Sequence, residues 1–206
     1  MSKIIVVSGA AGSGKGTVLN ELFKLSDSFR YSVSFTSRKP RPGEVDGVNY
    51  FFVTREEFEK RIQNGDFAEH VEYCGNYYGT SSSYIRSLRD AGYNVVLEIE
   101  TVGALNIMKA VPDSVSIFLA PPSYTVLEQR LRGRGTETEE DIQKRLSRAK
   151  EEIQISKNYE YIVLNRDGEM LRAAQKILDI CNDNAVSDEI LISEQKQEFI
   201  NTFLNN

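Results

Sequence analysis

The sequence predicts an α/β protein with a doubly wound parallel sheet, and three observations carry this prediction. Short apolar runs recur along the chain without alternation, as expected of strands that are buried on both faces. Segments with helical periodicity separate these runs, which is the order that produces βαβ units. The first run, at residues 4–7, passes into a glycine-rich turn and then into a helix with Val18, Leu19 and Leu22 on one side.

The later strands and helices continue the same alternation. Three further apolar runs have the composition of buried strands and span residues 95–97, 115–119 and 161–164. Four segments have apolar residues at helical spacing and span residues 103–110, 123–132, 141–155 and 169–182. Because no repeat or low-complexity stretch interrupts them, the 206 residues are expected to form one domain.

Residues 31–91 break the alternation and are predicted to form an inserted α+β lobe. A Pro/Gly-rich turn is followed by an aromatic strand at residues 50–53. A helix then opens with a capping box formed by Thr54 and Glu57. A second aromatic segment, at residues 73–80, adds to the β-rich character of this insertion.

Two further segments stand outside the main pattern. The polar, glycine-containing stretch at residues 133–138 leads into a long charged helix. From residue 183 onward, scattered apolar residues predict one or two helices that pack on the core or on a second copy of the chain.

The composition excludes several functional classes. The chain has 25 Lys and Arg against 30 Asp and Glu, so a basic nucleic-acid-binding surface is not expected. No apolar run approaches the roughly 18 residues of a membrane helix, and no signal-peptide pattern is present, which predicts a cytoplasmic protein. Cys74 and Cys181 are expected to be reduced, and with one histidine they are too few for a zinc site.

A phosphate-loop motif lies between the first strand and the first helix. Its glycines allow successive backbone N–H groups to curl round a polyphosphate, and Lys15 can reach the outer phosphates. Gly16 stands where Ser or Thr usually follows the lysine, with Thr17 one place later. The alternative is a glycine-rich turn that binds nothing, but the flanking strand and helix favour a site for ATP. The predicted ATP-binding loop comprises Gly9, Ala10, Ala11, Gly12, Ser13, Gly14, Lys15, Gly16 and Thr17.

Two acidic residues end the strand at residues 95–97. Glu98 and Glu100 are two residues apart and therefore share a face. An acidic strand end beside a phosphate loop is where Mg²⁺ and its waters are usually held, so these residues and Thr17 are the candidate metal ligands, directly or through water. The alternative is a solvated strand end.

A rigid turn brings together groups suited to a second anion. Arg38 and Arg41 flank its prolines, and Tyr50 follows. Arginine presents a planar fork that matches phosphate oxygens, and the tyrosine hydroxyl adds a neutral donor. Taken alone, this cluster also fits a solvated basic turn.

With this turn included, the sequence resembles the guanylate kinase family over at least residues 4–182. The resemblance is carried by TSRKPRPGEVDGVNYFFV at residues 36–53, GNYYG at 75–79, Glu98-Ile-Glu100, and RGRGTE at 132–137. It implies that the GMP phosphate is held by Arg38, Arg41, Tyr50 and Tyr78. It further implies that the remaining GMP contacts are Ser34, Glu69, Thr80 and Glu100.

The chemistry of these residues agrees with a guanine ligand. Guanine presents N1–H and N2–H₂ donors that the carboxylate of Glu69 can accept together, whereas adenine has no such donor pair. The hydroxyls of Ser34 and Thr80 can donate to the guanine O6 acceptor. Singly, Glu69 could be an exposed edge-strand acid and Tyr78 an ordinary packed aromatic.

The resemblance also implies which residues close over ATP. Arg130, Arg134 and Arg145 match the family's lid arginines, and Asn165 is assigned to the ATP site. Arg132 and Arg148 are interpreted as surface charges. The predicted catalytic residues are Lys15, Arg38, Arg134 and Arg145. The chain departs from the family pattern at Val102, at Arg166 and in having Glu98 and Glu100 where some members have aspartates.

The predicted reaction is transfer of the ATP γ-phosphoryl to GMP or dGMP with Mg²⁺, by a monomer or homodimer. The predicted layout is a core of residues 1–32, 92–130 and 150–182, a GMP-binding lobe of 33–91, a mobile lid of about 131–149 and a C-terminal extension of 183–206. Two alternatives stay open. One is a non-catalytic scaffold module that binds a phosphopeptide, and the other is a phosphate-loop kinase for a different small acceptor.

Overall fold

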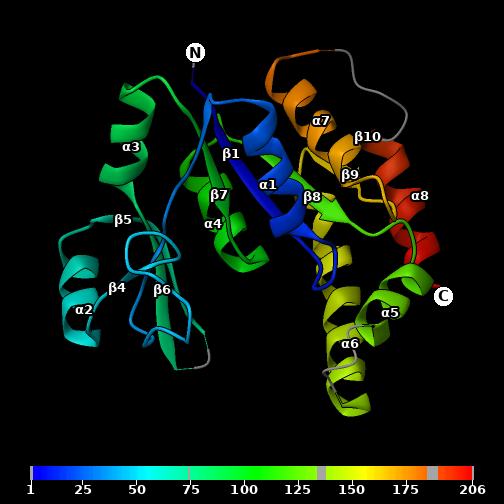
Figure 1. Cartoon of the computed structure of the whole chain (residues 1–206), viewed down its shortest axis with the longest axis horizontal. Coiled ribbons are helices and arrows are strands. Elements are labelled where there is room, and N and C mark those ends of the chain that lie inside the picture. The colour runs from blue at the N-terminus through cyan, green and yellow to red at the C-terminus, as the bar shows by residue number, and fades with distance from the viewer. Residues whose placement is uncertain (1, 74, 134–137, 185–189, 206) are drawn as a thin grey trace. The chain divides into compact units, whose positions relative to one another are not determined.

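The computed structural model describes residues 2–73, 75–133, 138–184 and 190–205, which form eight α-helices, one 3₁₀ helix and ten strands (Figure 1). The chain divides into two compact units. The first contains Met1–Val6 and Ser28–Ser114, and the second contains Val7–Asp27 and Val115–Asn206. Strand β1 contributes residues to both units.

The larger sheet has the strand order β10-β9-β8-β1-β7-β2. Strand β2 pairs with β7 and β8 pairs with β9 in parallel, while β10 pairs with β9 antiparallel. The α/β class is therefore confirmed, with an antiparallel edge strand that the sequence analysis did not predict. The six strands are β1 Ile4–Gly9, β2 Phe29–Tyr31, β7 Asn94–Glu98, β8 Val115–Ala120, β9 Tyr161–Leu164 and β10 Ile190–Leu191.

The first unit also contains a smaller sheet with the order β4-β3-β6-β5. Its strands are β3 Phe35–Thr36, β4 Phe51–Phe52, β5 Phe67–Tyr73 and β6 Asn76–Ser81. The helices of this unit are α2 Arg55–Gln63, α3 Ser82–Asp90 and α4 Thr101–Ala110. A register shift between Phe67 and Glu69 marks a bulge in β5, and Glu69 is paired with Thr80 on β6.

Helix α2 begins where the capping signal predicts. The hydroxyl of Thr54 accepts the backbone N–H of Glu57 at 3.1 Å, while the Glu57 side chain pairs with Arg61 at 3.0 Å. The helix packs on β5 and β6 through Phe58, which is fully buried. The Phe58 ring stacks on Phe67 and on Tyr77, with centroids 4.4 and 5.2 Å apart. This aromatic stack is the core of the small sheet.

The second unit contains five α-helices and the 3₁₀ helix. Helix α1 packs on α7, and α5 packs on α6 (Figure 1). The C-terminal α8 contacts α6, and its Phe203 is buried against Tyr124 of α5. These elements are α1 Lys15–Leu25, α5 Tyr124–Gly133, α6 Glu139–Ile155, the 3₁₀ helix Ser156–Asn158, α7 Met170–Cys181 and α8 Ser193–Leu204.

Most predicted elements match the structure within two residues, and the differences have local causes. Strands β2 and β10 were missed because three- and two-residue strands have no measurable periodicity. The predicted tail helix is α8. Cys181 is buried as expected, whereas Cys74 lies outside the described residues. Within the described ranges, every helix is too short or too polar to cross a bilayer.

Removing the Phe58 ring should destabilise the small sheet. We expect Phe58→Ala to lower the free energy of unfolding by about 3–5 kcal/mol, because the cavity cannot close between two stacked rings. Urea titration measures this, with Lys60→Ala, an exposed position on the same helix, as the control. A loss below about 1 kcal/mol, the size of an ordinary surface substitution, would contradict the assigned core.

Candidate active site

The phosphate loop connects β1 to α1 in the second unit. Gly14 has a left-handed backbone with φ of 84° and forms the N-cap of α1. Gly12 has φ of 87°, so both positions suit glycine. Gly9 is required for a different reason. A Cβ there would lie 2.2 Å from the carbonyl oxygen of Leu119 on β8, so no larger residue fits. The loop therefore has the shape that the motif predicts.

The loop presents a set of donors at the start of α1. Its lysine folds back, and Lys15 Nζ donates to the carbonyl oxygen of Gly9 at 2.6 Å. In the described part of the chain, we find no partner for the N–H groups of Gly12, Gly14 and Lys15. These N–H groups and the Lys15 ammonium create a positive potential suited to a polyanion, and the exposed Thr17 adds a hydroxyl.

Asn165 supports this loop from the end of β9. It is buried, and its Nδ2 donates to the carbonyl oxygen of Ser13 at 2.8 Å. Among the described residues its Oδ1 has no hydrogen-bond partner. Arg130 on α5 donates to the backbone oxygen of Asn165 at 2.8 Å and to Asp167 at 2.7 Å. Of the two residues assigned to the ATP site outside the loop, Asn165 thus contacts the loop and Arg130 contacts Asn165.

The predicted lid arginines have different surroundings. Arg145 lies half-buried on α6, and Arg134 lies outside the described residues. Arg132 is exposed and pairs with Glu128 and Glu139, in agreement with its interpretation as a surface charge.

Arg148 is also a surface charge, with a side chain that is 40% exposed, but it pairs with a buried residue. Its guanidinium Nε donates to the carboxylate of Glu152 at 3.2 Å, and Glu152 is only 4% exposed. The helical pattern did not reveal this pair, because Glu152 occupies a position on the apolar side of α6.

The predicted anion cluster forms in the first unit, after β3. The Arg38 guanidinium makes two hydrogen bonds of 2.9 Å to the carboxylate of Glu44, which also accepts the backbone N–H of Arg41. Arg38 lies over the ring of Tyr50, which is 6.0 Å from the ring of Tyr78. The side chain of Arg41 belongs to an exposed residue. The turn therefore assembles two cations and two aromatic hydroxyls around one carboxylate.

The electrostatics of this cluster follow from these contacts. The Glu44 carboxylate, with a smaller contribution from the Tyr78 hydroxyl, raises the pKa of Arg38. The same bond from Arg38 lowers the pKa of Glu44. Burial raises the pKa of Tyr50, so its hydroxyl stays protonated and able to donate. Glu44 was missed by the sequence analysis, although its position three residues after Arg41 in the turn was a usable signal.

A buried carboxylate lies on the neighbouring strand pair. Glu69 is 7% exposed, and its Oε1 accepts the hydroxyl of Thr80 at 2.7 Å. Its Oε2 is buried and has no partner among the described residues. Burial raises the pKa of Glu69, against the opposing bond from Thr80. Ser34 precedes β3, the strand on the other side of β6. Two of the predicted base-binding residues, Glu69 and Thr80, thus lie on one small sheet, and Ser34 directly precedes one of its strands.

Gly103 on α4 leaves the space that this carboxylate occupies. A Cβ at this position would lie 2.8 Å from Glu69 Oε2. A single glycine in a helix has no sequence signature of this role, which depends on the contact between α4 and β5.

The candidate metal ligands of the first unit lie at the end of β7 and just after it. Glu98 is exposed and accepts the Tyr31 hydroxyl at 3.2 Å, and Glu100 is the exposed N-cap of α4. In the part of the chain that the structure describes, no group of three or more His, Cys, Asp or Glu is placed to hold a metal. Exposed carboxylates still fit Mg²⁺, which keeps several waters and uses one or two carboxylates.

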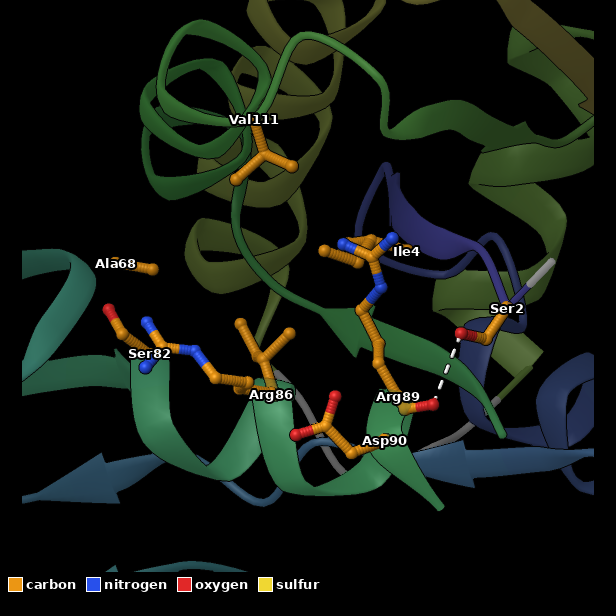
Figure 2. Close-up of a pocket in the computed structure, with 9 residues that line it drawn as sticks. Ser2, Ile4, Ala68, Ser82, Arg86, Arg89, Asp90 and Val111 are labelled. Carbon is orange, nitrogen blue, oxygen red and sulfur yellow. Dashed lines mark hydrogen bonds between the residues drawn. The ribbon is translucent and has the colours of Figure 1, made fainter. Parts of the chain in front are cut away.

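A separate cavity of about 380 Å³ lies in the first unit (Figure 2). Arg86, Arg89 and Asp90 of α3 line it together with Ser2 and Val111, and the Ser2 hydroxyl donates to the backbone oxygen of Arg89. None of the predicted site residues lines this cavity, and its charges are of mixed sign. It is therefore not a candidate for the substrate site.

Comparison with known proteins identifies the family of this chain. The guanylate kinase family profile matches residues 1–180. Guanylate kinases of Streptococcus thermophilus and Streptococcus pyogenes are 53% and 52% identical over 175 residues, which is 84% of this chain and 83% or 82% of theirs. The crystal structure of guanylate kinase from Anaplasma phagocytophilum is 31% identical, has a TM-score of 0.69 and covers 92% of this chain and 90% of its own. The chain belongs to the guanylate kinase family.

Proposed function

We propose that this protein transfers the γ-phosphoryl group of ATP to GMP or dGMP, giving ADP and GDP or dGDP. The observation that carries the acceptor assignment is the buried Oε2 of Glu69, which has no partner among the described residues. A buried carboxylate oxygen without a donor is costly, so a ligand that supplies donors is favoured. Guanine supplies two adjacent donors, N1–H and N2–H₂. The known reaction of the family supports the same assignment.

The hydroxyls beside Glu69 complete the proposed guanine pocket. Thr80 already donates to Glu69 Oε1, and this bond orients the carboxylate. Ser34 supplies a donor for the guanine O6. Adenine places an acceptor where guanine has N1–H, so it leaves the Glu69 oxygen without a donor.

The GMP phosphate is assigned to Arg38, Arg41, Tyr50 and Tyr78. In the structure the Arg38 guanidinium is held by Glu44. A guanidinium has five N–H donors, so Arg38 can keep one bond to Glu44 while it donates to phosphate oxygens. Glu44 thereby orients a cation that would otherwise be mobile. The exposed Arg41 adds a second cation.

The phosphates of ATP are assigned to the loop N–H groups and to Lys15. Arg130 and Asn165 are assigned to the ATP site, and Arg134 and Arg145 to the transferring group. We assign Thr17, Glu98 and Glu100 to Mg²⁺, in part through water. When bound, Mg²⁺ neutralises charge on the phosphates of ATP.

Catalysis on this scheme consists of alignment and charge stabilisation. The acceptor oxygen of a phosphate monoester is already anionic at neutral pH, so no general base is assigned. Two polyanions repel each other, and the cations of the loop, the turn and the lid offset this repulsion. We propose that residues 33–91 and about 131–149 close over the substrates and exclude water, which would otherwise hydrolyse ATP.

The substrate assignment is tested by an ADP-release assay with Mg-ATP and one nucleoside monophosphate at a time. We expect turnover with GMP and dGMP, and none with AMP, CMP, UMP or dTMP. Turnover with another acceptor would overturn the guanine assignment. No turnover by protein that still binds ATP would favour a binding module.

Substitutions in the GMP-phosphate site and in the ATP-phosphate site should affect different kinetic parameters. We expect Arg41→Met to raise the KM for GMP, because a charged hydrogen bond to phosphate is lost, by about tenfold. Lys15→Met should instead lower kcat by about 100-fold or more, since Lys15 acts on charge that develops in transfer. Steady-state kinetics with each substrate varied in turn measures both. The reverse pattern would mean that the two phosphate sites are exchanged.

Replacing Glu69 by Gln should improve stability while it impairs GMP binding. The pKa of Glu69 is raised in the folded state, so folding binds a proton between the unfolded and folded pKa values. The wild type therefore loses stability as pH rises through that window, and Glu69→Gln does not. We expect the stability of the variant relative to wild type to increase as the pH rises from about 4, near the ordinary pKa of a glutamate, toward neutral pH, measured by urea unfolding.

The same variant should raise the KM for GMP by about tenfold or more and leave the KM for ATP unchanged, because an amide offers one acceptor in place of two. Glu72→Gln, an exposed position on the same strand, is the control. An unchanged KM for GMP would remove Glu69 from the guanine pocket.

A further inference from the structure

A charged residue occupies the apolar side of α6. The buried positions of this helix are Ile142, Leu146, Ala149, Ile153 and Glu152. Four of them are small or apolar and face the core of the second unit, as helical spacing requires. Glu152 is 4% exposed, so its carboxylate is removed from water almost as completely as its neighbours.

Burial of this carboxylate requires compensation, and two groups in the described part of the chain contribute to it. The backbone N–H of Ala11 donates to Glu152 Oε2 at 3.3 Å, and Arg148, one turn earlier on α6, donates to Oε1 at 3.2 Å. The Arg148 side chain is 40% exposed, so the ion pair reaches from the core to the surface. A buried ion pair is rarely a net source of stability, because desolvation offsets the Coulomb attraction. Its presence suggests a role in fixing structure.

The donor Ala11 belongs to the phosphate loop. Within the loop, the N–H of Ser13 closes a turn on the carbonyl oxygen of Ala10 at 2.9 Å. The N–H of Ala11 is held from outside the loop, by Glu152, in the middle of this turn. The next residue is Gly12, whose left-handed backbone has access to many conformations. Glu152 thus restrains the residue that precedes this glycine.

Glu152 also connects the loop to the helix that carries Arg145. The two residues are seven positions apart on α6, which is two turns or about 10 Å along the axis. Helix α6 begins at Glu139, after the segment assigned to the lid, so its orientation determines where Arg145 is presented. The hydrogen bond between Glu152 and Ala11 therefore holds α6 at a fixed place relative to the loop.

We propose that Glu152 is a positioning residue that fixes the phosphate loop to α6 through the N–H of Ala11, so that the loop is ordered for the triphosphate and Arg145 is held at a set place beside it. Arg148 neutralises the carboxylate, which would otherwise repel the phosphates of ATP. This inference rests on the proposed function for the identity of the ligand. It adds a residue that touches neither substrate nor the transferring group.

Glu152 should favour ATP binding by ordering the loop and oppose it through the repulsion of its charge by the phosphates. Two substitutions separate these effects. Glu152→Ala removes both the acceptor for Ala11 and the negative charge. Glu152→Gln removes the charge but keeps a carbonyl oxygen that can accept the same N–H. Glu151→Ala and Glu151→Gln are matched controls, because Glu151 is the adjacent, exposed residue of the same helix.

The experiment measures the Kd for ATP by calorimetry, the KM for each substrate, kcat and the thermal midpoint of every variant. We expect Glu152→Ala to weaken ATP binding about tenfold, as for one lost hydrogen bond to the loop, and to lower kcat. The KM for GMP should stay within about twofold, and Glu152→Gln should restore ATP binding to within about threefold of wild type. The Glu151 variants should match wild type.

Three results would overturn the proposal. The first is a lower thermal midpoint with unchanged ATP binding and kcat, which would make Glu152 merely structural. The second is tighter ATP binding in both Glu152 variants, which would mean that charge repulsion dominates. The third is an equal rise in KM for ATP and GMP. If Glu152→Ala does not fold, failure of Glu152→Gln to retain ATP affinity decides against the hydrogen bond.

Measurements on the wild-type protein distinguish failure of the proposed function from failure of the Glu152 proposal. If wild-type protein binds ATP but does not phosphorylate GMP, the acceptor assignment fails. The calorimetric comparison of the Glu152 variants remains valid in that case, because it needs ATP binding alone.

Discussion

The site depends on a backbone constraint at the phosphate loop. Strand β1 and the carbonyl of Leu119 approach so closely at Gly9 that no Cβ fits between them, and the loop then turns through Gly12 and Gly14 with left-handed backbones. Only this path directs successive N–H groups toward a common point at the start of α1. Asn165 and Glu152 then hold the outer side of the loop, so the donors are ordered before a ligand binds.

Two carboxylates, those of Glu69 and Glu152, are buried, and they differ in how their oxygens are paired. Both Glu69 and Glu152 are at most 7% exposed, and each accepts a hydrogen bond through one oxygen from a neighbouring element. The second oxygen of Glu152 is paired with Arg148, whereas that of Glu69 has no partner in the described residues. We propose that the paired carboxylate fixes structure and that the unpaired one accepts donors from a ligand.

In the arginine turn a third carboxylate, that of Glu44, binds the Arg38 guanidinium and the backbone of Arg41. Glu44 receives two bonds from Arg38 and one from the backbone of Arg41, so the turn is already folded around an acidic group. A phosphate can take the place of part of this carboxylate, because both present oxygens that match a guanidinium fork. In the proposed function, binding of the acceptor phosphate to this folded turn costs little conformational entropy.

The sequence by itself determined the α/β class, the phosphate loop, the arginine turn and the N-cap at Thr54, because each depends on the chemistry of neighbouring residues in the chain. Arg134 stays a prediction, since it lies outside the described residues. The partner Asp167, the space left by Gly103 and the bond between Glu152 and Ala11 were decided by tertiary structure alone. Glu152 and Ala11 are 141 residues apart, and no local pattern encodes a contact over that separation. Helical periodicity even favoured an apolar residue at position 152, because periodicity reports which face is buried and carries no information about which polar groups meet there.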